Sequence, residues 1–277
     1  MRVFAVSDIH VDFDPNARWL AGLSTQDYRD DFLILAGDVC HSLRLLEGCL
    51  ITLANRFRAV LYVPGNHELW VTDDDKTKTS LDKFEEVCAI MKNCGVSGTA
   101  LHDDRLSIVP LLGWYDYSFG EPCNELNEMW MDFVACKWPQ PMGMREVASY
   151  FVAMNQPLLR PANNIVISFS HFLPRIDVMP HHIPERYRRL YPVLGTNLLE
   201  RQIRRLRSDI HVYGHSHVNR QVKIDGITYI NNAFGYPAEK RITAKHLLRI
   251  YQDGWHNSDR HGQHEFGRNL CADEIIE

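Results

Sequence analysis

The chain has 277 residues, of which 45% are hydrophobic, and its 30 Lys and Arg against 35 Asp and Glu give a net charge of −5. This length allows one or two domains with a sizeable core, and the acidic balance offers no overall positive field for nucleic acid or an anionic membrane. No apolar stretch approaches the roughly 18 residues that a membrane-spanning helix needs. Strand-like residues begin at Val3 without a signal-peptide pattern, and the seven cysteines include no CxxC pair. We therefore expect a cytoplasmic protein with reduced thiols and neither a membrane nor a nucleic acid as its partner.

Three short apolar segments near the start of the chain are predicted strands, and polar residues follow each of them. They are spaced by about thirty residues, the size of a strand-plus-helix unit. Helices are predicted over 42–57 and 79–95, and Thr79 with Asp82 forms a predicted capping pair for the second one. The strands and the polar residues after them are 3–6 with Asp8 and His10, 32–36 with Asp38, and 59–63 with Asn66 and His67.

Two later apolar segments repeat this pattern: 165–169 precedes His171, and 210–213 precedes His215 and His217. A hairpin through Asp225-Gly226 is predicted next, because this dipeptide is a strong two-residue turn signal. The segment 113–145 is rich in aromatic residues, contains several prolines and fits no regular period, so we interpret it as an insertion. We expect a single domain over 1–251 and a polar C-terminal tail over 252–277 that packs loosely.

Five predicted strands therefore end in residues that are typical of metal sites. In α/β sheets ligands bind beyond the carboxyl ends of the strands, so these side chains can converge. Two Asp, one Asn and several His form a ligand set without thiolate, which suits Mn, Fe or Zn better than Ca. The set exceeds the need of one four-coordinate ion and favours two divalent or trivalent ions that share a carboxylate. Two metals about 3.5–4 Å apart can hold a bridging hydroxide and polarise a phosphoryl oxygen.

The order and residues of these motifs resemble the motifs of the calcineurin-like metallophosphoesterase superfamily. The matching pieces are Asp8-Ile9-His10, Gly37-Asp38, Gly65-Asn66-His67-Glu68, His171 and Gly214-His215-Ser216-His217. They occur in the family's order and span most of the chain. The resemblance implies an α/β fold, a two-sheet sandwich of mixed β-sheets flanked by helices.

The resemblance also implies a role for each matching residue. The first metal would be held by Asp8, His10 and His217, the second by Asn66, His171 and His215, with Asp38 bridging the two. His67 would not bind metal; it would face the substrate phosphate and assist the leaving group. His67 and Asp38 are therefore the predicted catalytic residues.

The chain departs from the phosphoprotein-phosphatase branch of this superfamily after the second motif. That branch carries an Asp-Arg pair where this chain has His41 and Ser42. Without the Arg, a bidentate phosphate clamp is missing, which disfavours a protein serine/threonine phosphatase. Without the Asp, the residue that orients His67 is not identified.

We expect a metal-dependent phosphoesterase that hydrolyses a small phosphorylated substrate through a dinuclear site and a metal-bound hydroxide. One alternative is a phosphodiesterase, including one for cyclic nucleotides, because both activities share the metal motifs. Another is a non-catalytic interaction module on the same fold. Substituted metal ligands would favour that module, but all seven predicted ligand positions carry ligand-type residues. In the loop after His171, His181 and His182 are either an exposed pair or substrate-facing, and Arg186 or Arg189 is a candidate phosphate contact.

Overall fold

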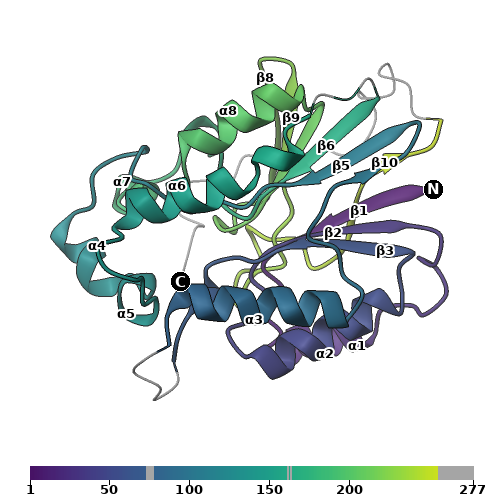
Figure 1. The fold of residues 1–277 in the computed structure, drawn as a ribbon, viewed down its shortest axis with the longest axis horizontal. Helices are drawn as coiled ribbons and strands as arrows, with labels where there is room; N and C mark the ends of the chain where they lie inside the picture. The colour runs from purple at the N-terminus through teal and green to yellow at the C-terminus, as the bar shows by residue number, and fades with distance from the viewer. Residues whose placement is uncertain (73–77, 161, 163, 255–277) are drawn as a thin grey trace.

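The computed structural model describes residues 1–72, 78–160, 162 and 164–254. Two mixed β-sheets lie face to face, and helices cover their outer faces (Figure 1). This arrangement confirms the predicted two-sheet sandwich. The described part contains no helix that is long and apolar enough to cross a membrane.

The first sheet has four strands, and the three that come first along the chain run parallel. The last strand of the sheet, β10, is antiparallel to β1. In spatial order the strands are β10 (Leu248–Gln252), β1 (Arg2–Val6), β2 (Phe32–Ala36) and β3 (Ala59–Val63).

The second sheet has six strands, with a parallel centre and an antiparallel strand at each edge. In spatial order they are β4 (Leu101–His102), β5 (Leu106–Pro110), β6 (Ile165–Phe169), β7 (Ile210–Tyr213), β9 (Ile227–Asn231) and β8 (Arg220–Ile224). A parallel bridge between Ser7 and Ala233 joins the end of β1 to the residues after β9. The carboxyl ends of the parallel strands of both sheets therefore meet at one end of the sandwich.

The helices form the two outer layers (Figure 1). Three of them cover the first sheet: α1 (Asp14–Ala21), α2 (Leu43–Ala54) and α3 (Ser80–Asn93). Two cover the second sheet: α6 (Met144–Met154) and α8 (Asn197–Leu206). Short helical segments occupy the connections: η1 (His67–Leu69), α4 (Asn124–Met129), α5 (Asp132–Ala135), η2 (Gln156–Leu158), η3 (Ile176–Val178), α7 (Glu185–Arg188) and η4 (Tyr191–Val193).

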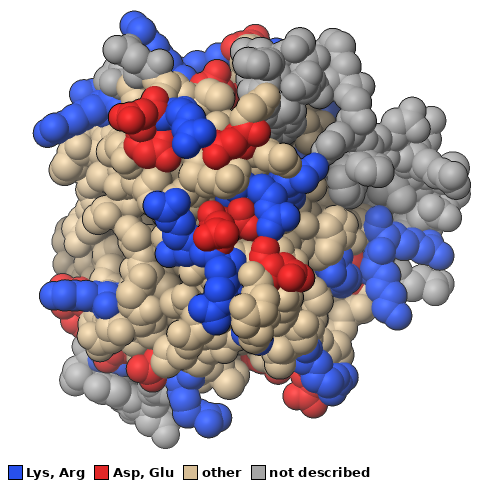
Figure 2. Space-filling model, turned by 90° about the vertical axis from the view of Figure 1, so that its right-hand side faces the viewer, with Lys and Arg blue, Asp and Glu red and all other residues tan. Residues whose placement is uncertain are grey.

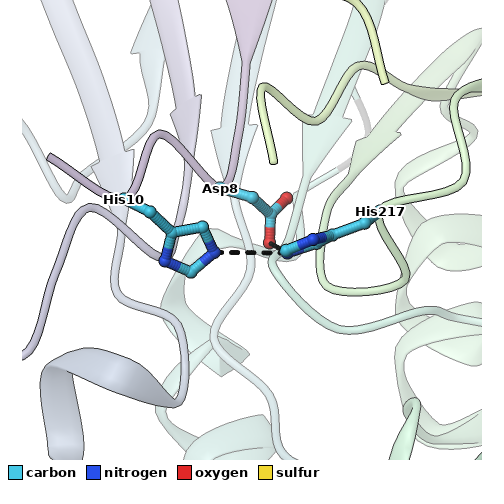
Figure 3. A group of neighbouring side chains, drawn as sticks. All are labelled: Asp8, His10 and His217. Atoms are coloured by element: carbon cyan, nitrogen blue, oxygen red, sulfur yellow. Dashed lines mark hydrogen bonds and ion pairs between the residues drawn. The ribbon is translucent and has the colours of Figure 1, made fainter. Parts of the chain in front are cut away.

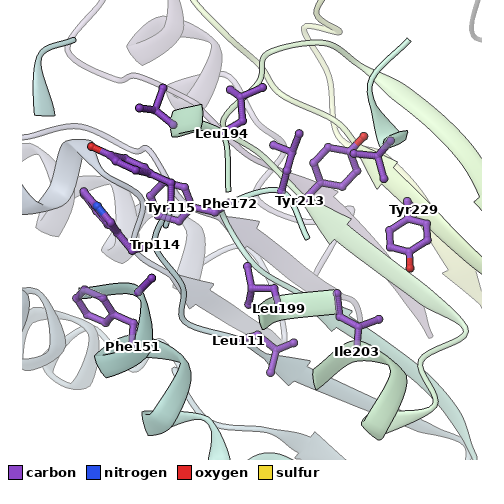
Figure 4. Packing of buried hydrophobic residues seen from close by; sticks show 14 of the residues in the cluster. Leu111, Trp114, Tyr115, Phe151, Phe172, Leu194, Leu199, Ile203, Tyr213 and Tyr229 are labelled. Atoms are coloured by element: carbon purple, nitrogen blue, oxygen red, sulfur yellow. The ribbon is translucent and has the colours of Figure 1, made fainter. Parts of the chain in front are cut away.

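The central strands are mostly apolar because both of their faces are buried, and β2 (FLILA) is apolar and buried along its whole length. In β2, Ile34 packs between the sheets, whereas Leu33 and Leu35 pack against the helices of the first sheet. On the far side of the second sheet, α6 and α8 contribute Phe151, Leu199 and Ile203 to the buried cluster that also holds Tyr213 of β7 and Tyr229 of β9 (Figure 4). These layers hold the strands in place, so the polar residues that directly follow the strands start from fixed positions.

Two local predictions are confirmed. The Thr79 side chain accepts a hydrogen bond from the backbone of Asp82 while the Asp82 carboxylate accepts one from the backbone of Thr79, so α3 begins with a capping box. Asp225 and Gly226, with φ of 47° and 89°, form the turn between β8 and β9. The helix predicted over 42–57 is shorter, Leu43–Ala54.

The two segments that were predicted to lie outside the regular fold differ in what the structure describes. The aromatic segment 113–145 contains α4, α5 and the start of α6, and its Trp114 and Tyr115 are buried in the core of the second sheet. Gln252, the first residue of the predicted tail, belongs to β10, and residues 255–277 lie outside the described residues. The single-domain organisation stays a prediction.

The end of the sandwich at which β1 begins carries charges of both signs. Figure 2 shows Lys and Arg interspersed with Asp and Glu on this face. The amino group of Met1 and the guanidinium of Arg105 both pair with Asp253, at 3.1 and 3.3 Å. The opposite end of the sandwich collects the predicted ligands.

Candidate metal centre

The predicted ligands converge at the carboxyl ends of the strands. Two groups of donor atoms, each within 4.8 Å of one another, are Asp8 with His10 and His217, and Asp38 with His171 and His215. A third group of this kind joins His10, Asp38 and His67, so Asp38 borders both halves of the centre. The seven predicted ligands are buried, whereas His67 is partly exposed.

The first group joins the ends of β1 and β7. Nε2 of His217 lies 3.2 Å from Oδ1 of Asp8 and 3.2 Å from Nε2 of His10 (Figure 3). Nδ1 of His217 donates to Oε2 of Glu239 at 2.7 Å. A carboxylate on the far nitrogen fixes the ring orientation and leaves Nε2 available to a metal.

The second group is built around His171. Its Nε2 lies 3.1 Å from Oδ1 of Asn66, 3.1 Å from Nδ1 of His215 and 3.4 Å from Oδ2 of Asp38. The far nitrogens of the two rings donate to main-chain carbonyls, His171 to Ala36 at 2.9 Å and His215 to Val193 at 3.0 Å. Because a carbonyl only accepts, these bonds direct Nε2 of His171 and Nδ1 of His215 into the site.

The spacing of the donor atoms fits metal ions. Ligands that share an ion at metal–ligand distances of about 2.0–2.2 Å lie roughly 3.0–3.5 Å apart. The 3.1–3.2 Å separations between the facing ring nitrogens fall in that range. Imidazole nitrogens, carboxylates and one amide oxygen suit Mn, Fe or Zn, so the residues present fit a two-ion centre.

Burial and the neighbouring carboxylates act in opposite directions on the pKa values of the histidines predicted as ligands. Burial lowers the pKa of His10 and the pKa of His215, each to about 3. Burial also lowers the pKa of His171, but Asp38 outweighs it and raises this pKa to about 9. Burial likewise lowers the pKa of His217, but Asp8 and Glu239 together outweigh it and raise this pKa to about 10. Each group of the metal-free protein therefore holds one proton where an ion would bind.

Metal binding should release these protons. At pH 7 the pKa values of about 9 for His171 and about 10 for His217 keep both rings protonated, so each ion has to displace about one proton. We expect the apparent metal affinity to rise by about tenfold per pH unit between pH 6 and 8. Calorimetric titrations in buffers of different ionisation enthalpy measure the proton release directly. An affinity that stays constant over this range would contradict the protonated state of the metal-free rings.

The backbone around the centre adopts left-handed conformations that non-glycine residues rarely accept. Five of the seven predicted ligands have positive φ: Asp8 53°, His10 46°, Asp38 52°, His215 67° and His217 52°. Such conformations are found at functional sites, where the surrounding structure has to enforce them. Here the residues with positive φ directly follow strand ends, and their side chains come from separate loops to one point.

The turn Pro64-Gly65-Asn66 brings the backbone close to the shared carboxylate. A Cβ on Gly65 would lie 2.1 Å from Oδ1 of Asp38, so only glycine fits this position. The backbone N–H of His67 donates to the same oxygen at 3.1 Å. The buried carboxylate of Glu68 accepts from the backbone of Gly65 and of Val39, both at 2.6 Å, and ties the two loops together.

His67 lies beside both groups. Its Nε2 is 3.8 Å from Oδ2 of Asp38, and its ring centroid is 4.7 Å from that of His10. The ring stacks on Trp70, with centroids 3.8 Å apart and an interplanar angle of 30°. The ring of His41 is 6.3 Å from the same Trp70 ring. The aromatic face of Trp70 therefore supports His67 on one side.

No sequence pattern indicated that the loop after β9 reaches the site. Tyr236 of this loop stacks on His10 with centroids 4.5 Å apart, and its backbone N–H donates to Oε2 of Glu239 at 2.7 Å. The ammonium of Lys245 donates to the carbonyls of Gly235 and Tyr236 at 3.1 and 2.9 Å. No spacing pattern links these residues to the motifs before them, so only the structure brings them to the site.

The residues left open in the loop after His171 lie near the surface. His181 and His182 are exposed, which favours the exposed-pair interpretation. Arg189 pairs with Glu125 of the insertion at 2.9 Å. The guanidinium of Arg186 lies over the ring of Tyr187 at 4.8 Å.

Known proteins resemble this chain in sequence and fold. [Acyl-carrier-protein] phosphodiesterase PptH of Mycobacterium tuberculosis is 27% identical over 269 residues, which cover 86% of this chain and 79% of the relative. The crystal structure of phosphopantetheinyl hydrolase (PptH) from Mycobacterium tuberculosis matches with a TM-score of 0.76 and 26% identity, over 91% of this chain and 96% of that one. The model of the calcineurin-like phosphoesterase family matches residues 1–219. With more than half of its length matched, the chain belongs to the calcineurin-like phosphoesterase family.

Proposed function

We propose that this phosphoesterase hydrolyses a phosphodiester at a centre of two divalent or trivalent metal ions. The observation that carries the proposal is the pair of buried donor groups that border Asp38. The similar protein of Mycobacterium tuberculosis is a phosphodiesterase, which favours a diester among the phosphoester classes.

In this proposal every predicted ligand has one task. Asp38 would serve both ions, whereas Asp8, His10 and His217 would hold the first ion and Asn66, His171 and His215 the second. When bound, the ions supply the positive charge that polarises the phosphoryl group and activates water. The chain supplies orientation: Glu239 and the carbonyls of Ala36 and Val193 hold the imidazoles in place. His67, partly exposed beside the donor groups, hydrogen-bonds to or protonates the leaving oxygen.

The charge of the substrate also favours a diester. A phosphomonoester carries a charge of about −1.5 to −2 at pH 7, whereas a diester has lost the second ionisable oxygen and carries a single charge. Position 42 is Ser rather than an Arg that would clamp a doubly charged phosphate. Because the similar protein is an acyl-carrier-protein phosphodiesterase and a phosphopantetheinyl hydrolase, we propose the phosphopantetheinyl diester of a carrier protein as the substrate.

A substrate panel tests the proposal. The purified protein should contain up to two Mn, Fe or Zn ions per chain, and it should hydrolyse diesters faster than the corresponding monoesters. The panel comprises a phosphopantetheinylated carrier protein, a cyclic nucleotide, bis-nitrophenyl phosphate and nitrophenyl phosphate. Release of phosphopantetheine from the carrier would identify the protein-bound diester as the substrate. Faster hydrolysis of the monoester would overturn the diester, and metal-loaded protein without any hydrolysis would favour the interaction module.

A further inference from the structure

One buried carboxylate of the insertion contacts the metal centre from outside. Asp132 is the first residue of α5 and is 1% exposed. Its Oδ1 accepts hydrogen bonds from Nδ2 of Asn66 at 2.9 Å and from Nε1 of Trp70 at 2.6 Å. Its Oδ2 accepts one from Nε1 of Trp130 at 2.9 Å. Three N–H groups, two from the loop after β3 and one from the insertion itself, therefore converge on a single side chain.

The donors fix which way the neighbouring groups face. An indole N–H only donates, so the carboxylate of Asp132 acts as the acceptor for Trp70 and Trp130. The amide of Asn66 then has to direct its NH₂ group toward Asp132 and its oxygen toward His171, whose Nε2 lies 3.1 Å from that oxygen. This is the orientation in which Asn66 offers an oxygen to a metal ion.

The same carboxylate reaches His67 through Trp70. The Trp70 ring stacks on His67 at 3.8 Å, and its only N–H is bound by Asp132. The edge of Trp130 packs on His215, with centroids 5.8 Å apart and the planes at 86°. Asp132 thus bonds to the predicted ligand Asn66, to Trp70, which packs on His67, and to Trp130, which packs on the predicted ligand His215.

The insertion is fixed against the metal-binding loop. The backbone N–H of Val71 donates to the carbonyl of Ala135 at 2.8 Å, and that of Ser80 donates to the carbonyl of Lys137 at 2.8 Å. The three hydrogen-bond partners of Asp132 are neutral, and burial raises the pKa of this carboxyl. A buried carboxylate with neutral partners is unfavourable for folding alone, which argues that its place serves the site.

We propose that Asp132 is a positioning residue, which holds the Asn66 oxygen toward the second metal and the Trp70 ring against His67. This inference rests on the proposed function. It also bears on the question raised by His41: position 41 offers no carboxylate, and the carboxylate of Asp132 acts on the His67 ring through Trp70.

Titration of the metal-free protein with Mn²⁺ alone tests the proposal without a substrate. Second-sphere contacts are typically worth about 10–100-fold in metal affinity, so Asp132→Ala should weaken one of two binding steps by about this factor. Its titration curve should resemble that of Asn66→Ala and differ from that of Glu239→Gln, which weakens the step that involves His217. The matched control is Glu128→Gln, which makes a similar loss of charge on the exposed face of the same insertion and should change neither step.

A rescue separates positioning from folding. In Asp132→Asn, the amide oxygen can serve Asn66 and Trp70 only if the NH₂ group faces the N–H of Trp130, where two donors conflict. Trp130→Phe removes that conflict, so the double variant should recover part of the affinity lost in Asp132→Asn. If wild-type protein binds two ions and Asp132→Ala binds both unchanged, the inference is wrong while the proposed function stands. Equal weakening of both steps with a lower melting temperature would assign Asp132 to folding, and wild-type protein that binds no ion would overturn the proposed function itself.

Discussion

Asp38→Asn should abolish stable binding of the metal pair and lower phosphodiesterase activity by about 10³-fold or more, because metal ions supply several kcal/mol of transition-state stabilisation. Asp38 is the one predicted ligand whose carboxylate borders donor groups on both sides of the centre. One oxygen lies 3.4 Å from Nε2 of His171, and the other accepts the backbone N–H of His67. The amide of Asn removes the negative charge and places an N–H donor where one of the ions needs an acceptor.

Elemental analysis and activity should fall together in this variant. The control is His102→Ala, which changes an exposed histidine of β4 whose ring bonds to Ser107 at 2.9 Å, far along the chain from the strand ends of the site. Circular dichroism of both variants should match the unmodified protein, because the sheets do not depend on the Asp38 side chain for their core. Full activity with Asn at position 38 would mean that the centre is assigned wrongly.

The strand ends explain why so much of the site was predictable from the sequence. Apolar segments such as 32–36 and 59–63 are buried on both faces, so their boundaries are visible as the point where polarity returns. The parallel order of β1, β2 and β3 then brings Asp8, Asp38 and Asn66 to one edge without further information. The two-sheet sandwich followed from the resemblance, which the family match confirms.

The residues that hold the ligands in place were not predictable in this way. Glu239 and Asp132 reach the centre from segments with no strand pattern, and each acts on a ligand far away in the sequence. Nothing local distinguishes Glu239 from the other acidic residues of a polar loop. The composition of 113–145 indicated an insertion, but the direction of one carboxylate within it depends on the tertiary contacts of Trp70 and Trp130.

His67→Ala should separate catalysis from metal binding. The ring lies beside the donor groups, is partly exposed and is supported by Trp70, which suits a group that meets the departing oxygen rather than an ion. General acid assistance is typically worth about 10²–10⁴-fold, but only when the leaving group is basic. An alkoxide leaves poorly without a proton, whereas a nitrophenolate leaves readily. We therefore expect a loss of about 10²–10⁴-fold on alkyl diesters and a far smaller loss on nitrophenyl esters.

The ratio of the two losses, measured at matched metal occupancy, decides the role of His67. Both ions should stay bound, because the seven predicted ligands are untouched by the change. A uniform loss on both substrate classes would assign the ring to phosphate binding, since binding energy does not depend on the basicity of the leaving group. Loss of metal would instead make His67 a ligand, as its place in the group with His10 and Asp38 allows geometrically. A leaving-group dependence would place the His67 ring at the departing oxygen, as a hydrogen-bond or proton donor, because neither phosphate binding nor metal binding senses the charge on that oxygen.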